Sequence, residues 1–155
     1  MSTSIADLHA AVAELDGILV VVPGEGSGLP ELAWGDSFLY YAPDGVMPTT
    51  VQPFATIVTK DYPDDTASRL GEGRFRLNVN VSRERFVALT GEEPRALERP
   101  REQDLADTVH PHPVYGAMGW IAIVNPGAST TALAVELLRE AHAAAKARAE
   151  RRDGV

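Results

Sequence analysis

Two histidines, His110 and His112, lie two residues apart in the segment HPHPVYG, which spans residues 110–116. In an extended chain such residues project to the same side, so the pair has the spacing to relay protons or to bind a metal ion. Catalysis would also need a carboxylate to orient a ring, and Asp36 and Asp61 are the candidates. The alternative, which we favour, is that the prolines stiffen the chain and the histidines hydrogen-bond the loop.

A second group of polar side chains follows the alternation of the sequence RFRLNVNV at residues 74–81. Its apolar residues point one way and its polar residues the other, as in a strand with one face in water. The polar residues are Arg74, Arg76, Asn78 and Asn80. The neighbouring strands would add Thr56, Thr59 and either Tyr40 or Tyr41.

Arginine and amide groups donate hydrogen bonds in fixed geometry, so this polar face suits an anionic or carbonyl-bearing small molecule. Tyr115, from the histidine segment, is expected to contribute to the same pocket. The plainer interpretation is a solvated sheet face whose arginines pair with acids across the strands.

We predict no cofactor and no metal site. Asp61, Asp64 and Asp65 are close together in KDYPDD, but the ligand offsets and the glycine of a calcium-binding loop are absent, so a solvated turn is expected. The glycines of residues 23–32 are not followed by the helix that a phosphate-binding loop requires. The patterns G-x-S-x-G, H-E-x-x-H and Walker A are also absent.

Hydrophobic periodicity predicts the elements that must position these residues. Helices are expected over residues 4–15, 82–90 and 130–149, and strands over residues 18–22, 34–42, 54–60, 74–81 and 118–124. The second and third strands form an expected antiparallel hairpin. Residues 92–112 are charged and rich in proline, which favours a surface excursion.

This order of elements indicates an α+β fold, an antiparallel sheet of about five strands with the N- and C-terminal helices packed on one face. The length of 155 residues fits one domain, which we assign to residues 1–150. Residues 151–155 are expected to form a frayed tail.

The net charge of −8 and the absence of cysteine exclude several classes of function. Disulfides, thiolate metal sites and cysteine nucleophiles are ruled out, and an N-terminal segment without a basic, apolar leader predicts a cytoplasmic protein with no membrane contact. Residues 1–66 hold ten carboxylates and one base, so nucleic acid is not an expected partner. The arginines that would serve such binding are Arg83, Arg85, Arg95, Arg99 and Arg101.

Three long segments carry a resemblance: QPFATIVTKDYPDDTASRL, FRLNVNVSRERF and HPHPVYGAMGWIAIVNP. Over about residues 34–148 the chain resembles an uncharacterised actinobacterial family, the DUF6194 domain. More remotely, it is similar to the MmcQ/YjbR-like proteins of CyaY-like fold, a resemblance that implies a DNA-binding role. Neither resemblance implies any catalytic residue.

The leading hypothesis is therefore a non-catalytic binding module for a small molecule or a partner protein. The first alternative is a small enzyme that uses His110 or His112 as general acid, base or metal ligand, with Arg74 or Arg76 holding an anion. Nucleic-acid binding is the third. Oligomeric state is not predicted.

Overall fold

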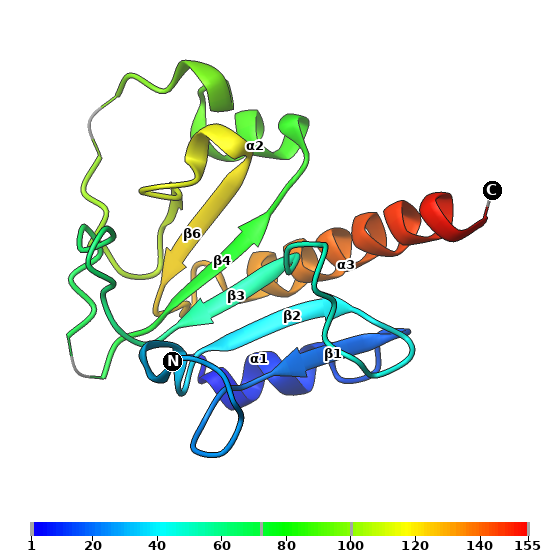
Figure 1. The fold of residues 1–155 in the computed structure, drawn as a ribbon. Helices are drawn as coiled ribbons and strands as arrows, with labels where there is room; N and C mark the ends of the chain where they lie inside the picture. The colour runs from blue at the N-terminus through cyan, green and yellow to red at the C-terminus, as the bar shows by residue number, and fades with distance from the viewer. Residues whose placement is uncertain (1, 72, 100, 155) are drawn as a thin grey trace.

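The computed structural model describes residues 2–71, 73–99 and 101–154 (Figure 1). Its strands are β1 (Ile18–Val21), β2 (Ser37–Tyr41), β3 (Ala55–Val58), β4 (Arg76–Asn80), β5 (Val109–Pro111) and β6 (Trp120–Val124). Its helices are α1 (Ile5–Val12), α2 (Arg83–Thr90) and α3 (Thr131–Gly154), with 3₁₀ turns at Glu31–Ala33, Pro94–Ala96 and Gly116–Met118.

Within the described residues, six strands form one antiparallel sheet in the order β1-β2-β3-β4-β6-β5. The α+β fold and the β2–β3 hairpin are thus confirmed. The sixth strand, β5, lies in the segment that the sequence analysis assigned to a surface excursion. Its three residues pair with β6 through His110 and Ala122, and a strand that short carries too little alternation to be recognised.

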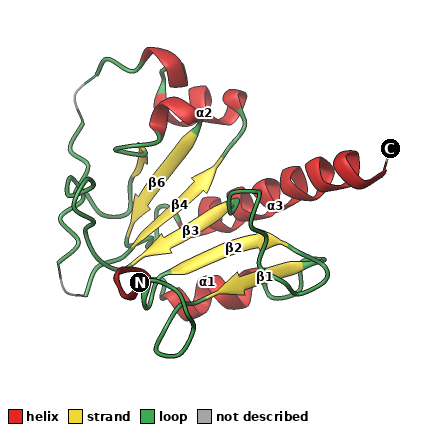
Figure 2. Ribbon diagram, in the orientation of Figure 1, coloured by secondary structure: helices red, strands yellow, loops and turns green. Residues whose placement is uncertain are grey.

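The helices cover one face of the sheet, as predicted. Figure 2 shows α1 and α3 together behind the strands. Leu77 of β4 packs with Ile123 of β6 in a buried core, to which α3 contributes Leu137 and Leu138. Phe86 brings α2 onto the same core. The alternation of residues 74–81 therefore divides the strand correctly into a core side and a polar side.

Serine side chains cap the starts of α1 and α2, whereas α1 ends at Val12 and not at residue 15 as predicted. Ser4 caps α1 through the N–H of Asp7, and Ser82 caps α2 through the N–H of Arg85. Gly91 ends α2 in the left-handed conformation, with φ of 77°. α3 continues to Gly154, so residues 151–154 of the expected tail are helical, and Val155 lies outside the described residues.

The face of the sheet opposite the helices is covered in part by the chain between β3 and β4. Leu70 of this segment, 1% exposed, packs on Val58 and Val124, with Tyr62 at the edge of the cluster. The polar face of β4 was expected to be solvated. This expectation is wrong for Arg76 and Asn78, which are each 2% exposed because the crossing segment closes one side of the face.

Candidate ligand-binding site

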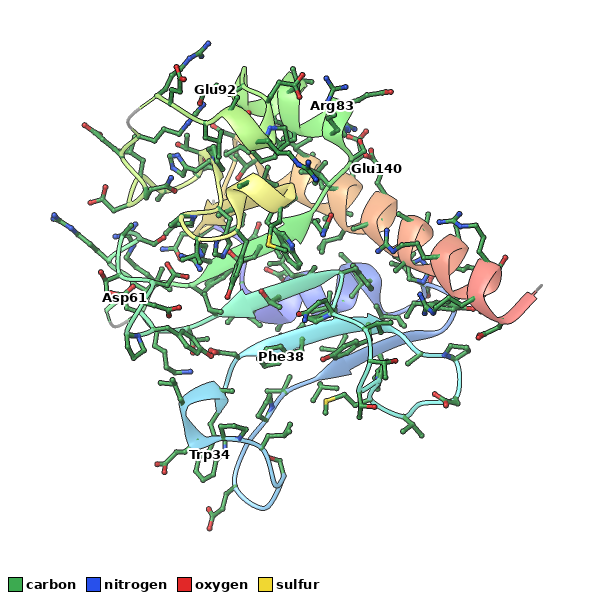
Figure 3. All side chains as sticks on the ribbon, turned by 45° about the horizontal axis from the view of Figure 1, so that its top comes forward. Trp34, Phe38, Asp61, Arg83, Glu92 and Glu140 are labelled. Carbon is green, nitrogen blue, oxygen red and sulfur yellow. The ribbon has the colours of Figure 1, made fainter. Side chains whose placement is uncertain are left out.

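A cavity of about 690 Å³ lies on this face of the sheet. Side chains at alternate positions of four neighbouring strands point into it, as the register requires. These are Phe38 and Tyr40 of β2, Thr56 and Val58 of β3, Arg76 and Asn78 of β4, and Trp120 of β6. Figure 3 shows Phe38 on β2 and Trp34 on the loop that precedes this strand.

The lining has a polar part and an apolar part. We call Thr56, Arg76, Asn78 and His112 the polar floor. The apolar wall consists of Pro30, Ala33, Phe38, Tyr40, Pro53, Val58 and Trp120. At the mouth, the apolar rim consists of Leu32, Val114, Tyr115 and Met118, all of them exposed.

Arg76 is the centre of the polar floor. Its Nη1 and Nη2 donate to the two carboxylate oxygens of Asp65, at 2.9 and 2.5 Å, in a bidentate ion pair. Nη1 also donates to Ser68 Oγ at 2.9 Å, and Nε donates to Asn78 Oδ1 at 2.7 Å. Burial acts to raise the pKa of Asp65, but the hydrogen bonds and the charge of Arg76 outweigh it, so the pKa is lowered. The pair is therefore charged at neutral pH.

His112 closes one end of the floor. Its Nδ1 accepts the backbone N–H groups of Val114 and Tyr115, both at 3.0 Å, and its ring lies 5.0 Å from that of Tyr115. Its Nε2 is 3.1 Å from Arg76 Nη2 and 4.0 Å from Asp65 Oδ2. Burial, followed by the positive charge of Arg76, holds the pKa of His112 far below 6.5. The ring is thus neutral at pH 7.

Asn78 and Thr56 complete the floor. Asn78 Nδ2 donates to Thr56 Oγ1 at 2.9 Å across the β3–β4 pair, where the two residues are directly opposite. One hydrogen-bonded chain therefore runs from Asp65 through Arg76 and Asn78 to Thr56. Such a chain fixes each side chain in a single orientation.

Residues 3–154 match the model of a family described as "Family of unknown function (DUF6194)". The chain belongs to this family. No curated protein and no solved structure matches the sequence. The description assigns no activity, so the chemistry of this DUF6194 member has to be argued from its site.

Among the predicted ligand-binding residues, the structure brings Arg76, Asn78 and Tyr115 to the pocket of the DUF6194 protein. Arg74 lies outside it and donates to the backbone carbonyls of Arg69 and Asp104. Asn80 lines a separate, smaller cavity of about 210 Å³ beside α3.

The two histidines face different surroundings. His112 lines the pocket, whereas buried His110 contacts the Leu105 carbonyl oxygen through Nε2 at 3.2 Å. Burial is the main cause that lowers the pKa of His110. Within the described residues, no hydrogen bond joins either histidine to Asp36 or Asp61.

The candidate acids instead stabilise loops. Asp36 is fully buried and accepts hydrogen bonds from Thr59 N and Oγ1, from Lys60 Nζ, and from the Tyr62 hydroxyl. Burial and the hydrogen bond to Asp36 raise the pKa of Tyr62. Asp61 Oδ1 accepts the N–H of Leu70 at 3.1 Å.

Sequence reasoning missed the part that Asp65 plays in the site. KDYPDD was interpreted as a solvated turn, yet Asp65 is the ionic partner of the buried arginine. A signal was present, because an arginine in a strand that is covered on its polar side needs a carboxylate. Any of the three aspartates in the adjacent loop could have been that carboxylate. Only the fold shows that Asp65, and not Asp61 or Asp64, pairs with Arg76.

Most arginines that would serve nucleic-acid binding are engaged with glutamates. Arg83 pairs with Glu93, Arg85 pairs with Glu136 and Glu140, and Arg99 and Arg101 pair with Glu92. Figure 3 shows Arg83 on α2 and Glu140 on α3 on the same side of the molecule. For the described residues, no group of three or more histidines and acids is arranged to hold a metal ion. No described helix is long and apolar enough to cross a membrane.

Proposed function

We propose that this DUF6194 protein is a non-catalytic binding module whose pocket on the sheet face accepts a small molecule. The observation that supports the proposal is the cavity itself, with its polar floor, its apolar wall and a volume of about 690 Å³. Ligand sites in proteins commonly measure about 300–1,000 Å³ and combine apolar walls with a few convergent polar groups.

The apolar rim gives the pocket an accessible mouth. Met118 is 71% exposed, Tyr115 48% and Leu32 47%. Exposed apolar side chains that gather around a cavity indicate a binding surface, because a folded chain gains nothing from leaving them in water. We infer that the ligand covers part of the rim when it binds.

The state of the ionisable groups favours binding over acid–base catalysis. His112 is neutral at pH 7, and its Nδ1 is committed to two backbone N–H groups. Asp65 is bound by both terminal nitrogens of Arg76. A general acid or base needs a pKa near the working pH and an atom free to exchange a proton, and neither residue has both.

Nucleic-acid binding of the kind suggested for YjbR-like proteins is less well supported. The paired arginines of α2 and the following loop leave little positive charge to displace counterions from phosphate groups. The same proposal includes an actinobacterial source and a cytoplasmic location, on the grounds of composition and resemblance given above.

A thermal-shift screen of small molecules tests the pocket. It uses one variant in which a larger side chain fills the pocket and one matched control variant with the same change outside it. Ala33 lies in the apolar wall, and Ala143 is exposed on α3. A ligand at 100 times its Kd should raise the Tm of the wild type and of Ala143→Trp by about 5–10 °C, and of Ala33→Trp far less.

Three results would contradict the proposal. A ligand that stabilised Ala33→Trp as much as the wild type would bind elsewhere. Conversion of a bound compound to product, followed by mass spectrometry, would favour the enzyme. If no compound raised the Tm, the pocket would be better assigned to a protein partner.

A further inference from the structure

The polar floor holds more hydrogen-bond donors than acceptors. A guanidinium group has five N–H bonds. Four of those of Arg76 donate within the chain, to Asn78, Ser68 and both oxygens of Asp65. The fifth, on Nη2, faces His112 Nε2 at 3.1 Å.

The tautomer of His112 determines the nature of the contact between Arg76 Nη2 and His112 Nε2, because both atoms then carry a proton. Its Nδ1 accepts two backbone N–H groups and therefore carries no proton. In a neutral imidazole the proton then sits on Nε2. His112 Nε2–H and the last N–H of Arg76 are thus two donors that lie 3.1 Å apart. Among the described residues, the nearby carboxylate oxygen Asp65 Oδ2 already accepts from Arg76 Nη2 and lies 4.0 Å from His112 Nε2, beyond hydrogen-bond distance.

Asn78 and Thr56 add further hydrogen-bond donors to those of Arg76 and His112 in the polar floor. Asn78 Nδ2 has two N–H bonds, one of which donates to Thr56 Oγ1. Because Thr56 Oγ1 accepts that bond, its own O–H can turn toward the cavity, and the structure assigns it no acceptor among the residues it describes. An acceptor brought in by a ligand would satisfy these groups.

The charges around the polar floor determine whether a ligand acceptor that binds there can be an anion or must be neutral. Asp65 already neutralises Arg76, and His112 is neutral, so the floor has no positive charge to offer an anion. Asp64 also lines the cavity and makes its surroundings negative. A carboxylate or phosphate ligand would lose its hydration without gaining a free cation.

We propose that the pocket binds a neutral molecule with a carbonyl-type oxygen at one end and an apolar or aromatic body. The oxygen accepts hydrogen bonds from the polar floor, and the body lies along the apolar wall. The inference deepens the proposed function and rests on it. It also narrows the ligand class expected from sequence, since an anion is no longer included.

Four probes of nearly equal size test this inference. Acetophenone offers a neutral carbonyl, benzoate an anion, benzamidine a cation with donors only, and ethylbenzene no polar group. Their Kd values are measured by following the backbone amide signals of pocket residues in NMR titrations at pH 7. We expect acetophenone to bind at least tenfold more tightly than each of the other three, a difference of about 1.4 kcal/mol.

One substitution checks that the polar floor causes the preference. Thr56→Val keeps the shape of the side chain and removes its hydroxyl, whereas Thr50→Val makes the same change at an exposed position outside the pocket. We expect Thr56→Val to weaken acetophenone about five- to tenfold and to leave ethylbenzene unchanged or tighter. Thr50→Val should behave as the wild type with every probe.

The outcomes separate this inference from the proposed function. Tighter binding of benzoate, or equal binding of ethylbenzene and acetophenone at the pocket signals, would overturn the neutral-acceptor inference and leave the pocket function intact. If no probe perturbed the pocket signals, the pocket function would fail, and the inference would fail with it.

Discussion

At the scale of single residues, Arg76 decides the character of the site. A buried guanidinium is tolerated when its charge is paired and most of its N–H groups are bonded, and Asp65, Ser68 and Asn78 together accept four of its five N–H bonds. Because of these contacts, the Arg76 guanidinium is not free to bind an anion, and it is held in one orientation. It therefore acts as a fixed donor next to His112, rather than as a clamp for a charged ligand.

Removing Asp65 should be costly, because it leaves the charge of Arg76 buried without a partner. We expect Asp65→Ala to lower the free energy of unfolding by about 3–5 kcal/mol, measured by urea denaturation. The double variant Asp65→Ala/Arg76→Met should lose less than the sum of the two single losses, since no unpaired charge remains.

The exposed pair of Arg83 and Glu93 provides the matched control for that ion pair. Glu93→Ala should lower the free energy of unfolding by about 0–1 kcal/mol, because water replaces the lost partner. Equal losses in Asp65→Ala and Glu93→Ala would mean that Arg76 is solvated in solution, and the account of the polar floor would be wrong.

At the scale of elements, the sheet and α3 are connected through Asp107. This residue has a positive φ of 54° and precedes β5. Its carboxylate accepts the N–H groups of Gly127, Ser129 and Thr130 and the hydroxyl of Thr130. Those hydrogen bonds hold its pKa well below 3.8, against the effect of burial. A residue of the loop thus stabilises the turn at residues 127–130 that leads into α3.

Loss of these hydrogen bonds should loosen the turn before α3 and with it the first turn of the helix. We expect Asp107→Ala to lower the Tm by a few degrees and to speed amide hydrogen exchange at Ala134 and its neighbours, which hydrogen-bond back into residues 127–131. Asp104→Ala, three residues earlier in the same loop, is the control and should leave exchange in α3 unchanged. Unchanged exchange in both variants would show that α3 starts without Asp107.

At the scale of the whole molecule, one sheet separates a sealed core from an open pocket. The helix side holds the main buried apolar core, whereas the other side is closed only where the segment between β3 and β4 crosses it. His9 is half-buried and His110 and His112 are buried, and burial is the largest cause that lowers the pKa of each of the three.

Stability should therefore fall as the pH falls from 7 to 4. The unfolded chain protonates these histidines near pH 6.5, whereas the folded chain resists protonation, so their contribution is complete above pH 6.5 and is lost below it. Urea midpoints followed by circular dichroism and by tryptophan fluorescence should move together. The slope between pH 6.5 and 5 should flatten in His112→Asn, whose Oδ1 can replace Nδ1 as acceptor. An unchanged slope would mean that His112 protonates freely in the folded chain.

The sequence by itself determined the α+β class, the hairpin and which side of residues 74–81 is apolar. These features depend on local chemistry, such as the alternation of Leu77 with Asn78. Such local features can be predicted from a single sequence because residues that are neighbours in sequence are also neighbours in space. Arg76, Asn78, His112 and Tyr115 were recognised as polar or aromatic groups that could line one surface.

Only the tertiary structure decided how those groups combine. It buried Arg76, chose Asp65 as its partner and assigned Asp36 to a loop instead of to a histidine. It also made β5 a strand, by pairing three residues with β6. The reason is physical: burial and long-range pairing are properties of how segments distant in sequence pack, so no local pattern specifies which carboxylate meets which cation.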